Sequence, residues 1–437
     1  MARRLDARAA DFAEQFSALI SAKRETEEDV AQAVRGIIAD VRARGDAALV
    51  ELTAKFDKLQ LTPDRLRVTA QELADAEAQC PAETLAALDV AAKRIEDYHR
   101  RQIPKDETYT DDIGATLGWR WTALDSVGLY VPGGTASYPS SVLMNAIPAR
   151  AAGVRRIVMV TPASGGKLNP LVLAAAKRAG IGEIYRIGGA QAVAALAYGT
   201  QTIAPVDKIV GPGNAFVAAA KREVFGVVGI DSIAGPSEIL VIADGANDPD
   251  WIAADLLSQA EHDASSQSIL ITDDPAFADK VSAAVERALT ILPRKEIASA
   301  SWKDFGGIVV VPKLEDGCEL ANRIAPEHLE LALEDPDALL ERIRHAGAIF
   351  LGRNTPEAMG DYIAGPNHVL PTSRTARFSS GLSVLDFMKR TTLLEMTPAA
   401  IAEIGPDAIA LAEAEGLDAH ARSIAARLNL ARKNKAR

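Results

Sequence analysis

From about residue 127 to residue 351, short continuous apolar runs alternate with segments of helical periodicity. Strands buried on both faces read as continuous apolar runs, and helices between them indicate parallel sheets covered on both sides. The apolar runs are Val127–Val131, Ile157–Val160, Ile184–Ile187, Lys208–Val210, Ile239–Ile242, Ile269–Ile271, Gly307–Val311 and Ala348–Leu351, and the helical segments include Pro170–Arg178, Ala190–Tyr198, Ala215–Phe225 and Pro275–Leu289. The runs are numerous enough for two parallel sheets, with a break near Ala234–Glu238.

The two ends of the chain follow other patterns. Residues 8–102 are predicted to be helical, because apolar residues recur there at helical spacing. After about Phe378 the alternation stops. A strand-like run, Gly381–Phe387, is followed by two predicted helices, Ala399–Glu415 and Asp418–Lys433. This tail is too short and too amphipathic to be stable alone, so it must pack on something, and a neighbouring subunit is one candidate.

Composition excludes several classes of protein. The net charge of −11 argues against a nucleic-acid partner, which requires a basic face. No apolar run approaches the roughly 20 residues that span a bilayer, and the basic start leads into an amphipathic segment, not a signal peptide. We therefore expect a cytoplasmic protein without membrane association. Cys80 and Cys318 have no CxxC partner, and we expect two reduced structural thiols.

Several polar segments contain residue types that bind metals. Gln259 and His262 are three residues apart in a segment predicted as a helix, Asp250–Glu261, and residues at this spacing share one helix face. Asp361 and His420 lie in two further polar segments. Individually, each fits a turn or surface role. Together the four side chains would supply two nitrogens and two oxygens, a set that suits zinc or another borderline divalent ion.

Glu327 and His328 are adjacent, between a predicted helix and the apolar run Leu329–Leu333. On a surface this is an ordinary solvated pair. In a pocket the two side chains are bases of different strength, because imidazole titrates near neutral pH and a buried carboxylate can activate water.

Three Gly-rich loops follow predicted strands. They begin within Val127–Ser141, Gly188–Gln191 and Gly211–Asn214. Ligands of open α/β sheets bind beyond the carboxyl ends of strands, and backbone amides at strand–helix junctions hold anions such as a pyrophosphate. These loops fit a nucleotide crevice but also fit simple tight turns. No GxGxxG fingerprint follows a strand, so the loops alone do not identify a cofactor.

Taken together, these segments resemble the histidinol dehydrogenase family over nearly the whole chain. The matching stretches are Val127-Gly-Leu-Tyr-Val-Pro-Gly-Gly, Gly188-Gly-Ala-Gln-Ala, Gly211-Pro-Gly-Asn-Ala-Phe-Val, Ala234-Gly-Pro-Ser-Glu, Asp255-Leu-Leu-Ser-Gln-Ala-Glu-His, Arg323-Ile-Ala-Pro-Glu-His-Leu-Glu, Gly365-Pro-Asn-His-Val-Leu-Pro-Thr and Glu415-Gly-Leu-Asp-Ala-His. So many matches in order make the resemblance highly specific.

The resemblance implies an enzyme that oxidises L-histidinol to L-histidine through histidinal, the last step of histidine biosynthesis. It implies NAD as oxidant, one zinc ion per subunit, and a homodimer in which the tail of one subunit completes the other's site. The implied zinc ligands are Gln259, His262, Asp361 and His420. Glu327 and His328 would be the acid/base pair, and Tyr130, Gln191 and Asn214 would contact NAD. The implied substrate-binding residues are Ser237, Gln259, His262, His328, Asp361, Glu415 and His420.

The resemblance also implies two incomplete Rossmann-like parallel-sheet domains, consistent with the missing fingerprint. We expect an α/β chain with an N-terminal helical region, residues 1–125, packed on the core. Residues 126–237 would form the first Rossmann-like domain, on the NAD side. Residues 238–377 would form the second, with the zinc and acid/base residues. Residues 378–437 would be the tail that completes the partner's site.

Three other hypotheses about the function are open at this point. A relative with the same scaffold, zinc and NAD could oxidise another alcohol, such as a sulfonated propanediol. A zinc hydrolase could use Glu327 to activate water without NAD. A non-catalytic binding protein is disfavoured, because the acid/base pair is intact.

Overall fold

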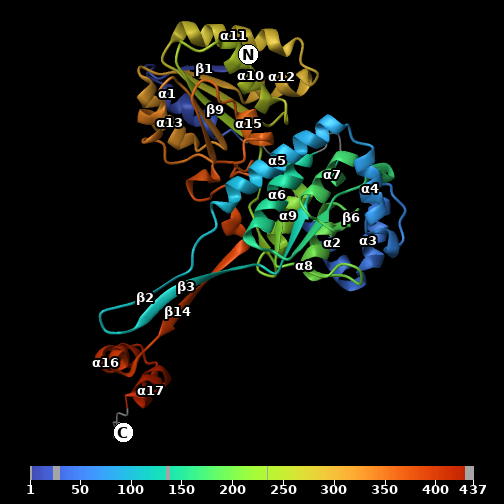
Figure 1. Cartoon of the computed structure of the whole chain (residues 1–437). Coiled ribbons are helices and arrows are strands. Elements are labelled where there is room, and N and C mark those ends of the chain that lie inside the picture. The colour runs from blue at the N-terminus through green and yellow to red at the C-terminus, as the bar shows by residue number, and fades with distance from the viewer. Residues whose placement is uncertain (1, 23–29, 134–137, 234, 429–437) are drawn as a thin grey trace. The chain divides into compact units, whose positions relative to one another are not determined.

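The structure is a computed structural model that describes residues 2–22, 30–133, 138–233 and 235–428. The chain forms two compact units (Figure 1). The larger unit comprises Met1–Gln102 and Leu124–Phe387, and the smaller comprises Ile103–Ala123 and Met388–Arg437. None of the helices in the described residues is long and apolar enough to cross a membrane.

The first sheet of the larger unit has five parallel strands in the order β6-β5-β4-β7-β8. The strands are β4 (Ser126–Tyr130), β5 (Arg156–Val160), β6 (Glu183–Tyr185), β7 (Lys208–Val210) and β8 (Gly229–Ile230), and the helices between them are α6 (Pro139–Ala152), α7 (Pro170–Arg178), α8 (Gly189–Tyr198) and α9 (Ala215–Val224). The predicted apolar runs in this region are confirmed as strands.

Residues 31–100 are mainly helical, as predicted, and their helices pack on the helices of this sheet. These helices are α2 (Ala31–Arg44), α3 (Asp46–Phe56), α4 (Ala70–Ala78) and α5 (Ala82–Arg100). Apolar side chains of α2 and α3 pack with those of α8 and α9 in one hydrophobic core. That packing places the end of α3 near the Gly-rich loops of the sheet.

The second sheet of the larger unit has six parallel strands in the order β1-β11-β10-β9-β12-β13. The strands are β1 (Arg3–Asp6), β9 (Glu238–Ala243), β10 (Gln267–Thr272), β11 (Gly307–Val310), β12 (His328–Ala332) and β13 (Ala348–Leu351). The helices are α1 (Phe12–Ile20), α10 (Pro249–Ala260), α11 (Pro275–Leu289), α12 (Lys295–Asp304), α13 (Leu314–Ile324), α14 (Asp337–Leu340) and α15 (Glu357–Tyr362).

Strand β9 shows why the apolar runs were continuous. Ile239 and Val241 belong to a hydrophobic core on one face of the sheet, and Leu240 and Ile242 belong to a core on the other. Every residue of the strand is therefore buried, as expected for a parallel sheet covered by helices on both faces. Two parallel sheets are confirmed.

The smaller unit contains an antiparallel sheet and two helices. The sheet order is β14-β3-β2, formed by β2 (Glu107–Thr110), β3 (Thr116–Ala123) and β14 (Met388–Glu395). The predicted tail helices are confirmed as α16 (Pro398–Ala414) and α17 (Asp418–Arg427). The predicted end of the second helix, residues 429–433, lies outside the described residues.

The strand predicted at Gly381–Phe387 is wrong. Val384–Phe387 is a short 3₁₀ helix in the larger unit, and the strand begins only at Met388. The Ser383 backbone N–H donates to Asp386 Oδ2 at 2.8 Å, and the Lys208 ammonium donates to the Asp386 carbonyl oxygen at 2.8 Å. These local bonds favour a turn over a strand at this position.

A buried ion pair fixes the Gly-rich loop that follows β7. Gly211 N donates to Asp231 Oδ2 at 2.7 Å, and Lys221 of α9 donates to the Gly211 carbonyl oxygen at 3.1 Å and pairs with Asp231. Gly211 has a φ of +113°, and a Cβ there would lie 2.1 Å from the Tyr130 carbonyl oxygen. The loop is therefore locked beside the end of β4, in a conformation that requires glycine.

We predict that Lys221→Met lowers the free energy of unfolding by about 3–5 kcal/mol, because Asp231 would stay buried without its cation. Urea denaturation measures the change. Arg35→Met is the matched control. Arg35 of α2 forms an exposed ion pair, 3.1 Å long, with Glu223 of α9, the helix that also carries Lys221. Loss of this pair should lower the free energy of unfolding by less than about 1 kcal/mol. Equal, small losses in both variants would contradict the locked loop.

Candidate active site

Glu327 and His328 lie where helix α13 meets strand β12. The helix ends at Ala325, which has a left-handed φ of 48°, and Pro326 then directs the chain into the strand. Both Glu327 and His328 are buried, with exposed fractions of 6% and 4%. Since His328 is the first residue of β12, the pair lies at the amino ends of the strands of the second sheet.

The hydrogen bonds of His328 determine which nitrogen carries its proton. Nδ1 lies 3.0 Å from the Glu238 carbonyl oxygen, which can only accept, so neutral His328 is protonated at Nδ1. Nε2 is buried and has no hydrogen-bond partner among the described residues. Glu327 Oε2 accepts from Glu238 N at 3.1 Å and lies 3.8 Å from His328 Nδ1. The result is an imidazole with a free lone pair beside a buried carboxyl group.

Helix α15 brings two more carboxyl groups to His328. Glu357 and Asp361 are one helical turn apart and therefore share a face. Glu357 Oε1 lies 3.6 Å and Asp361 Oδ1 lies 3.8 Å from His328 Nε2. The potential ligand atoms of these three residues all lie within 4.8 Å of one another, a spacing that could hold a metal ion.

Two more acidic residues position α15. Glu330 Oε1, on β12, accepts from the backbone N–H of Glu357 at 2.7 Å, and Ser258 Oγ donates to Glu357 Oε2 at 3.1 Å. Glu330 also forms a hydrogen bond with Asp255 of α10, and burial raises the pKa of both carboxyl groups. A hydrogen bond between two carboxyl groups requires one shared proton. This pair therefore joins α10, β12 and α15 behind the site.

Gln259 lies near the end of α10, and His262 follows that helix. Gln259 is fully buried, and neither of its amide atoms has a hydrogen-bond partner among the described residues. Helix α10 ends at Ala260, one residue earlier than predicted. His262 lies in the turn that follows, where its backbone N–H donates to the Gln259 carbonyl oxygen at 3.2 Å. His262 is nonetheless close enough to Asp361 to help lower the pKa of that carboxyl group, against the larger effect of burial.

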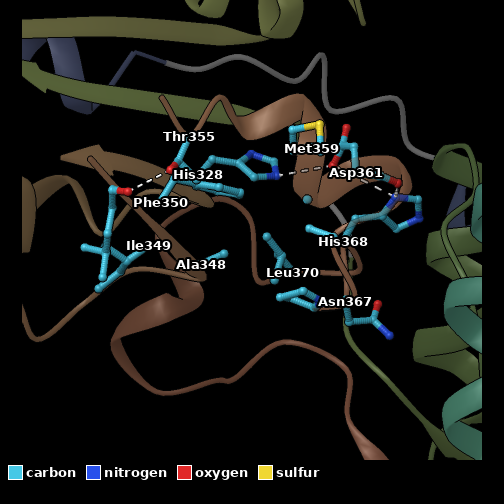
Figure 2. Close-up of a pocket in the computed structure, with 14 residues that line it drawn as sticks. His328, Ala348, Ile349, Phe350, Thr355, Met359, Asp361, Asn367, His368 and Leu370 are labelled. Atoms are coloured by element: carbon cyan, nitrogen blue, oxygen red, sulfur yellow. Dashed lines mark hydrogen bonds and ion pairs between the residues drawn. The ribbon is translucent and has the colours of Figure 1, made fainter. Parts of the chain in front are cut away.

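A cavity of about 280 Å³ lies beside these groups, and Figure 2 shows its lining. His368 enters the cavity wall from the segment after α15. Its Nδ1 donates to the Asp361 carbonyl oxygen at 2.9 Å, and Ser141 Oγ of α6 lies 3.4 Å from Nε2. The next residue towards the N-terminus, Asn367, donates to the Met144 carbonyl oxygen at 2.6 Å. His368 thereby connects the acidic helix α15 to α6 of the first sheet.

Burial has the largest effect on the pKa values of the ionisable groups in the site. It raises the pKa of Glu327 well above its ordinary value, and it raises the pKa of Glu357 and Asp361, because a desolvated carboxylate is disfavoured. It lowers the pKa of His328 and His368 for the same reason. Within the described chain, the ion pairs of the three carboxyl groups are formed with histidines. The site therefore suits a divalent cation or an ammonium group.

A second cavity, of about 380 Å³, lies at the carboxyl ends of the strands of the first sheet. Tyr130, Gln191 and Asn214, the three residues expected to contact NAD, all line it. The Tyr130 hydroxyl oxygen accepts from Gly189 N at 3.0 Å, so its own proton is free to donate. Asn214 Oδ1 caps helix α9 by accepting from Phe216 N at 3.1 Å, which leaves the Asn214 amide N–H₂ for a ligand. Gln191 is almost fully buried.

The other predicted residues lie elsewhere in the fold. Ser237 directly precedes Glu238, whose backbone holds Glu327 and His328. Glu415 and His420 belong to the smaller unit, at the end of α16 and in α17, and both are exposed in the single chain. Residues 134–137 of the first Gly-rich loop, and Ala234 of the segment before β9, lie outside the described residues.

Sequence reasoning missed Glu357 and the pair formed by Glu330 and Asp255. Glu357 carried a usable signal, because it precedes Asp361 by four residues and so shares its helix face. Glu330 interrupts the apolar run Leu329–Leu333, and a charged residue inside a buried strand requires a partner.

The sequence was compared with those of known proteins. It matches the profile of the family described as histidinol dehydrogenase over residues 20–428. It is 65% identical over 430 residues to histidinol dehydrogenase of Rhizobium meliloti (strain 1021), covering 98% of this chain and 99% of that protein. It is 64% identical to histidinol dehydrogenase of Ruegeria pomeroyi, covering 97% of this chain and 98% of that protein.

A solved structure gives the same result for the fold. The crystal structure of histidinol dehydrogenase from Elizabethkingia anophelis matches with a TM-score of 0.94 and 39% identity, covering 98% of each chain. The family profile, the close relatives and this structure all extend over nearly the full length of the sequence. The chain belongs to the histidinol dehydrogenase family.

Proposed function

We propose that this chain catalyses the NAD-dependent, four-electron oxidation of L-histidinol to L-histidine through histidinal, as the last step of histidine biosynthesis. Family membership supports the substrate. The observation that carries the chemistry is the free Nε2 lone pair of His328, oriented by the bond from Nδ1 to the Glu238 carbonyl. The proposed compartment is the cytoplasm, where reducing conditions suit the two free thiols, Cys80 and Cys318.

We propose that Gln259, His262 and Asp361 hold a zinc ion, together with His420. Both amide atoms of Gln259 are buried without partners among the described residues, and Asp361 is part of a buried acidic group, so these side chains fit a divalent cation. Bound zinc would hold the imidazole and amino nitrogens of the substrate and thereby fix the reacting carbon. Glu357 adds a negative charge suited to the substrate ammonium group.

We propose that the second cavity binds NAD through Tyr130, Gln191 and Asn214. Tyr130 and Asn214 each have a hydrogen-bond donor left for a ligand. The cavity lies at the carboxyl ends of the strands, where dinucleotides bind in open α/β sheets. NAD would accept one hydride in each of two rounds, because conversion of an alcohol to an acid removes four electrons.

His328 and Glu327 have separate roles in this scheme. His328 Nε2 accepts the proton of the substrate hydroxyl as the alcohol becomes an aldehyde. The aldehyde must then be hydrated, and Glu327 accepts a proton from the attacking water. His328 accepts the next hydroxyl proton as the hydrate becomes the acid. Neither cysteine lines the cavity beside His328, so hydration takes the place of a covalent thiol intermediate.

We propose that the active unit is a homodimer in which Ser237 and the metal-binding residues of one subunit meet Glu415 and His420 of the partner subunit. The smaller unit carries large apolar side chains that are exposed in the single chain, including Leu394 and Leu411, each 67% exposed. Exposed apolar surface of this kind is typical of a protein interface.

We predict that the metal-loaded protein forms two NADH per L-histidinol, and that removal of the metal by a chelator and dialysis abolishes turnover until zinc is restored. NADH absorbance at substrate exhaustion gives the ratio. A ratio of one would mean that oxidation stops at the aldehyde. Turnover without NAD would indicate a hydrolase instead.

We predict that His328→Asn slows both oxidations by roughly 100-fold or more, because the base is lost. Glu327→Gln should slow the oxidation of supplied histidinal by a similar factor, while the single-turnover rate of the alcohol step stays within about threefold. The Gln side chain retains the acceptor for Glu238 N, so local structure should be kept. Normal oxidation of histidinal by the Glu327 variant would refute its role in water activation.

We predict that inactive His262→Ala and His420→Ala subunits regain activity when they exchange. In a mixed dimer one of the two shared sites has all of its ligands, so full exchange of equal amounts should restore about one quarter of wild-type activity. Mass spectrometry of the intact dimers verifies exchange when one of the two variants, which otherwise have equal masses, is labelled with ¹⁵N. Confirmed heterodimers without activity would show that the sites are not shared.

A further inference from the structure

Asp57 lies in the second cavity but has no role in the function proposed above. It follows the last residue of helix α3, and its backbone N–H donates to the Thr53 carbonyl oxygen at 2.9 Å. The cavity lining brings Asp57 together with Tyr130, Gly188, Gly189 and Gln191 of the first sheet. An acidic residue from the N-terminal helices is thus built into the wall opposite the Gly-rich loops.

One oxygen of the Asp57 carboxyl group is unpaired within the described residues. Its Oδ2 atom is buried and has no hydrogen bond within the described residues. Burial raises the pKa of this carboxyl group, as expected where no cation compensates the lost solvent. A buried carboxylate oxygen without a donor is costly, so a ligand that brings hydroxyl donors would be favoured at this position.

The described lining contains no positive side chain. The residues are Ile37, Phe56, Asp57, Tyr130, Pro132, Gly133, Pro162, Gly188, Gly189, Ala190, Gln191, Asn214 and Phe216, and Asp57 carries the single formal charge among them. A dinucleotide pyrophosphate has backbone amides available at the start of helix α8. An additional phosphate group near Asp57 would meet a carboxylate, with no cation among the described lining residues to compensate it. The Lys55 ammonium group, outside this lining, lies 5.2 Å from the centroid of the Phe56 ring.

The neighbours of Asp57 suit a nucleoside. Ile37, Phe56 and Phe216 are apolar residues of the cavity wall, and Phe56 is half exposed, as needed for stacking on a base. Asp57 is the next residue in the chain, so a base on Phe56 would bring the hydroxyls of its own ribose towards the carboxylate.

We propose that Asp57 binds the ribose hydroxyls of the adenosine half of the dinucleotide and excludes a 2′-phosphate, which makes the enzyme specific for NAD over NADP. In Rossmann folds with the usual Gly-rich fingerprint, an acidic residue near the second strand has this task. This chain lacks that fingerprint, and the acid comes from helix α3. The proposal rests on the proposed use of NAD in this cavity.

Calorimetric titration of the full-length, metal-loaded protein with NAD⁺ and with NADP⁺ tests the proposal independently of turnover. Wild-type protein should bind NAD⁺ at least about 100-fold more tightly than NADP⁺. Asp57→Asn should lose about tenfold in NAD⁺ affinity and should reduce the preference over NADP⁺ by about tenfold or more. The KM for L-histidinol should be unchanged.

Glu51→Gln is the matched control, since it removes the same charge from an exposed position on the same helix α3. Asp57→Ser is a second variant that removes the carboxylate with a smaller side chain, and thermal unfolding verifies that each variant is folded. An unchanged NAD⁺ to NADP⁺ ratio in a folded Asp57 variant overturns the role of Asp57 alone. Wild-type protein that binds neither dinucleotide overturns the proposed cofactor use, and the Asp57 proposal with it.

Discussion

The candidate active site depends on the two backbone groups of Glu238. Its N–H binds Glu327 and its carbonyl oxygen binds His328, and both bonds cross from β9 to the adjacent strand β12. Because neighbouring parallel strands keep a fixed register, the orientation of both side chains follows from the sheet itself. No third side chain is needed to orient the imidazole, so the space around Nε2 is left for Glu357, Asp361 and a substrate.

The two candidate sites lie at opposite strand ends of the two sheets. The cavity that contains Tyr130 lies at the carboxyl ends of the strands of the first sheet, where open α/β sheets ordinarily bind ligands. His328 lies instead at the amino ends of the strands of the second sheet. The end of α10 and helix α15 lie at this same edge, held together by Glu330 and Asp255. His368 then links this edge to α6, a helix that packs on the first sheet.

The sequence predicted the parallel sheets well, because strands buried on both faces are apolar throughout. It predicted β12 less clearly, since His328 and Glu330 interrupt the apolar pattern there for reasons of chemistry. Gly381–Phe387 was misread as a strand because alternation cannot reveal the hydrogen bond between Ser383 and Asp386. Motif matches singled out Tyr130, Gln191 and His328. Glu357 carried a signal in its spacing from Asp361, but Asp57 required the fold, since a distant part of the chain brings the Gly-rich loops to it.

The antiparallel sheet of the smaller unit has a consequence for biosynthesis of the chain. Its central strand, β3, pairs with β2 nearby in sequence and with β14 near the C-terminus. The whole first sheet, and every strand of the second sheet except β1, is synthesised between β3 and β14. During synthesis, one edge of β3 therefore stays unpaired until β14 emerges from the ribosome, when almost the whole chain has been made. An exposed edge is prone to pair with other chains. The last strand of the described chain to be made thus pairs with one of the first strands to appear.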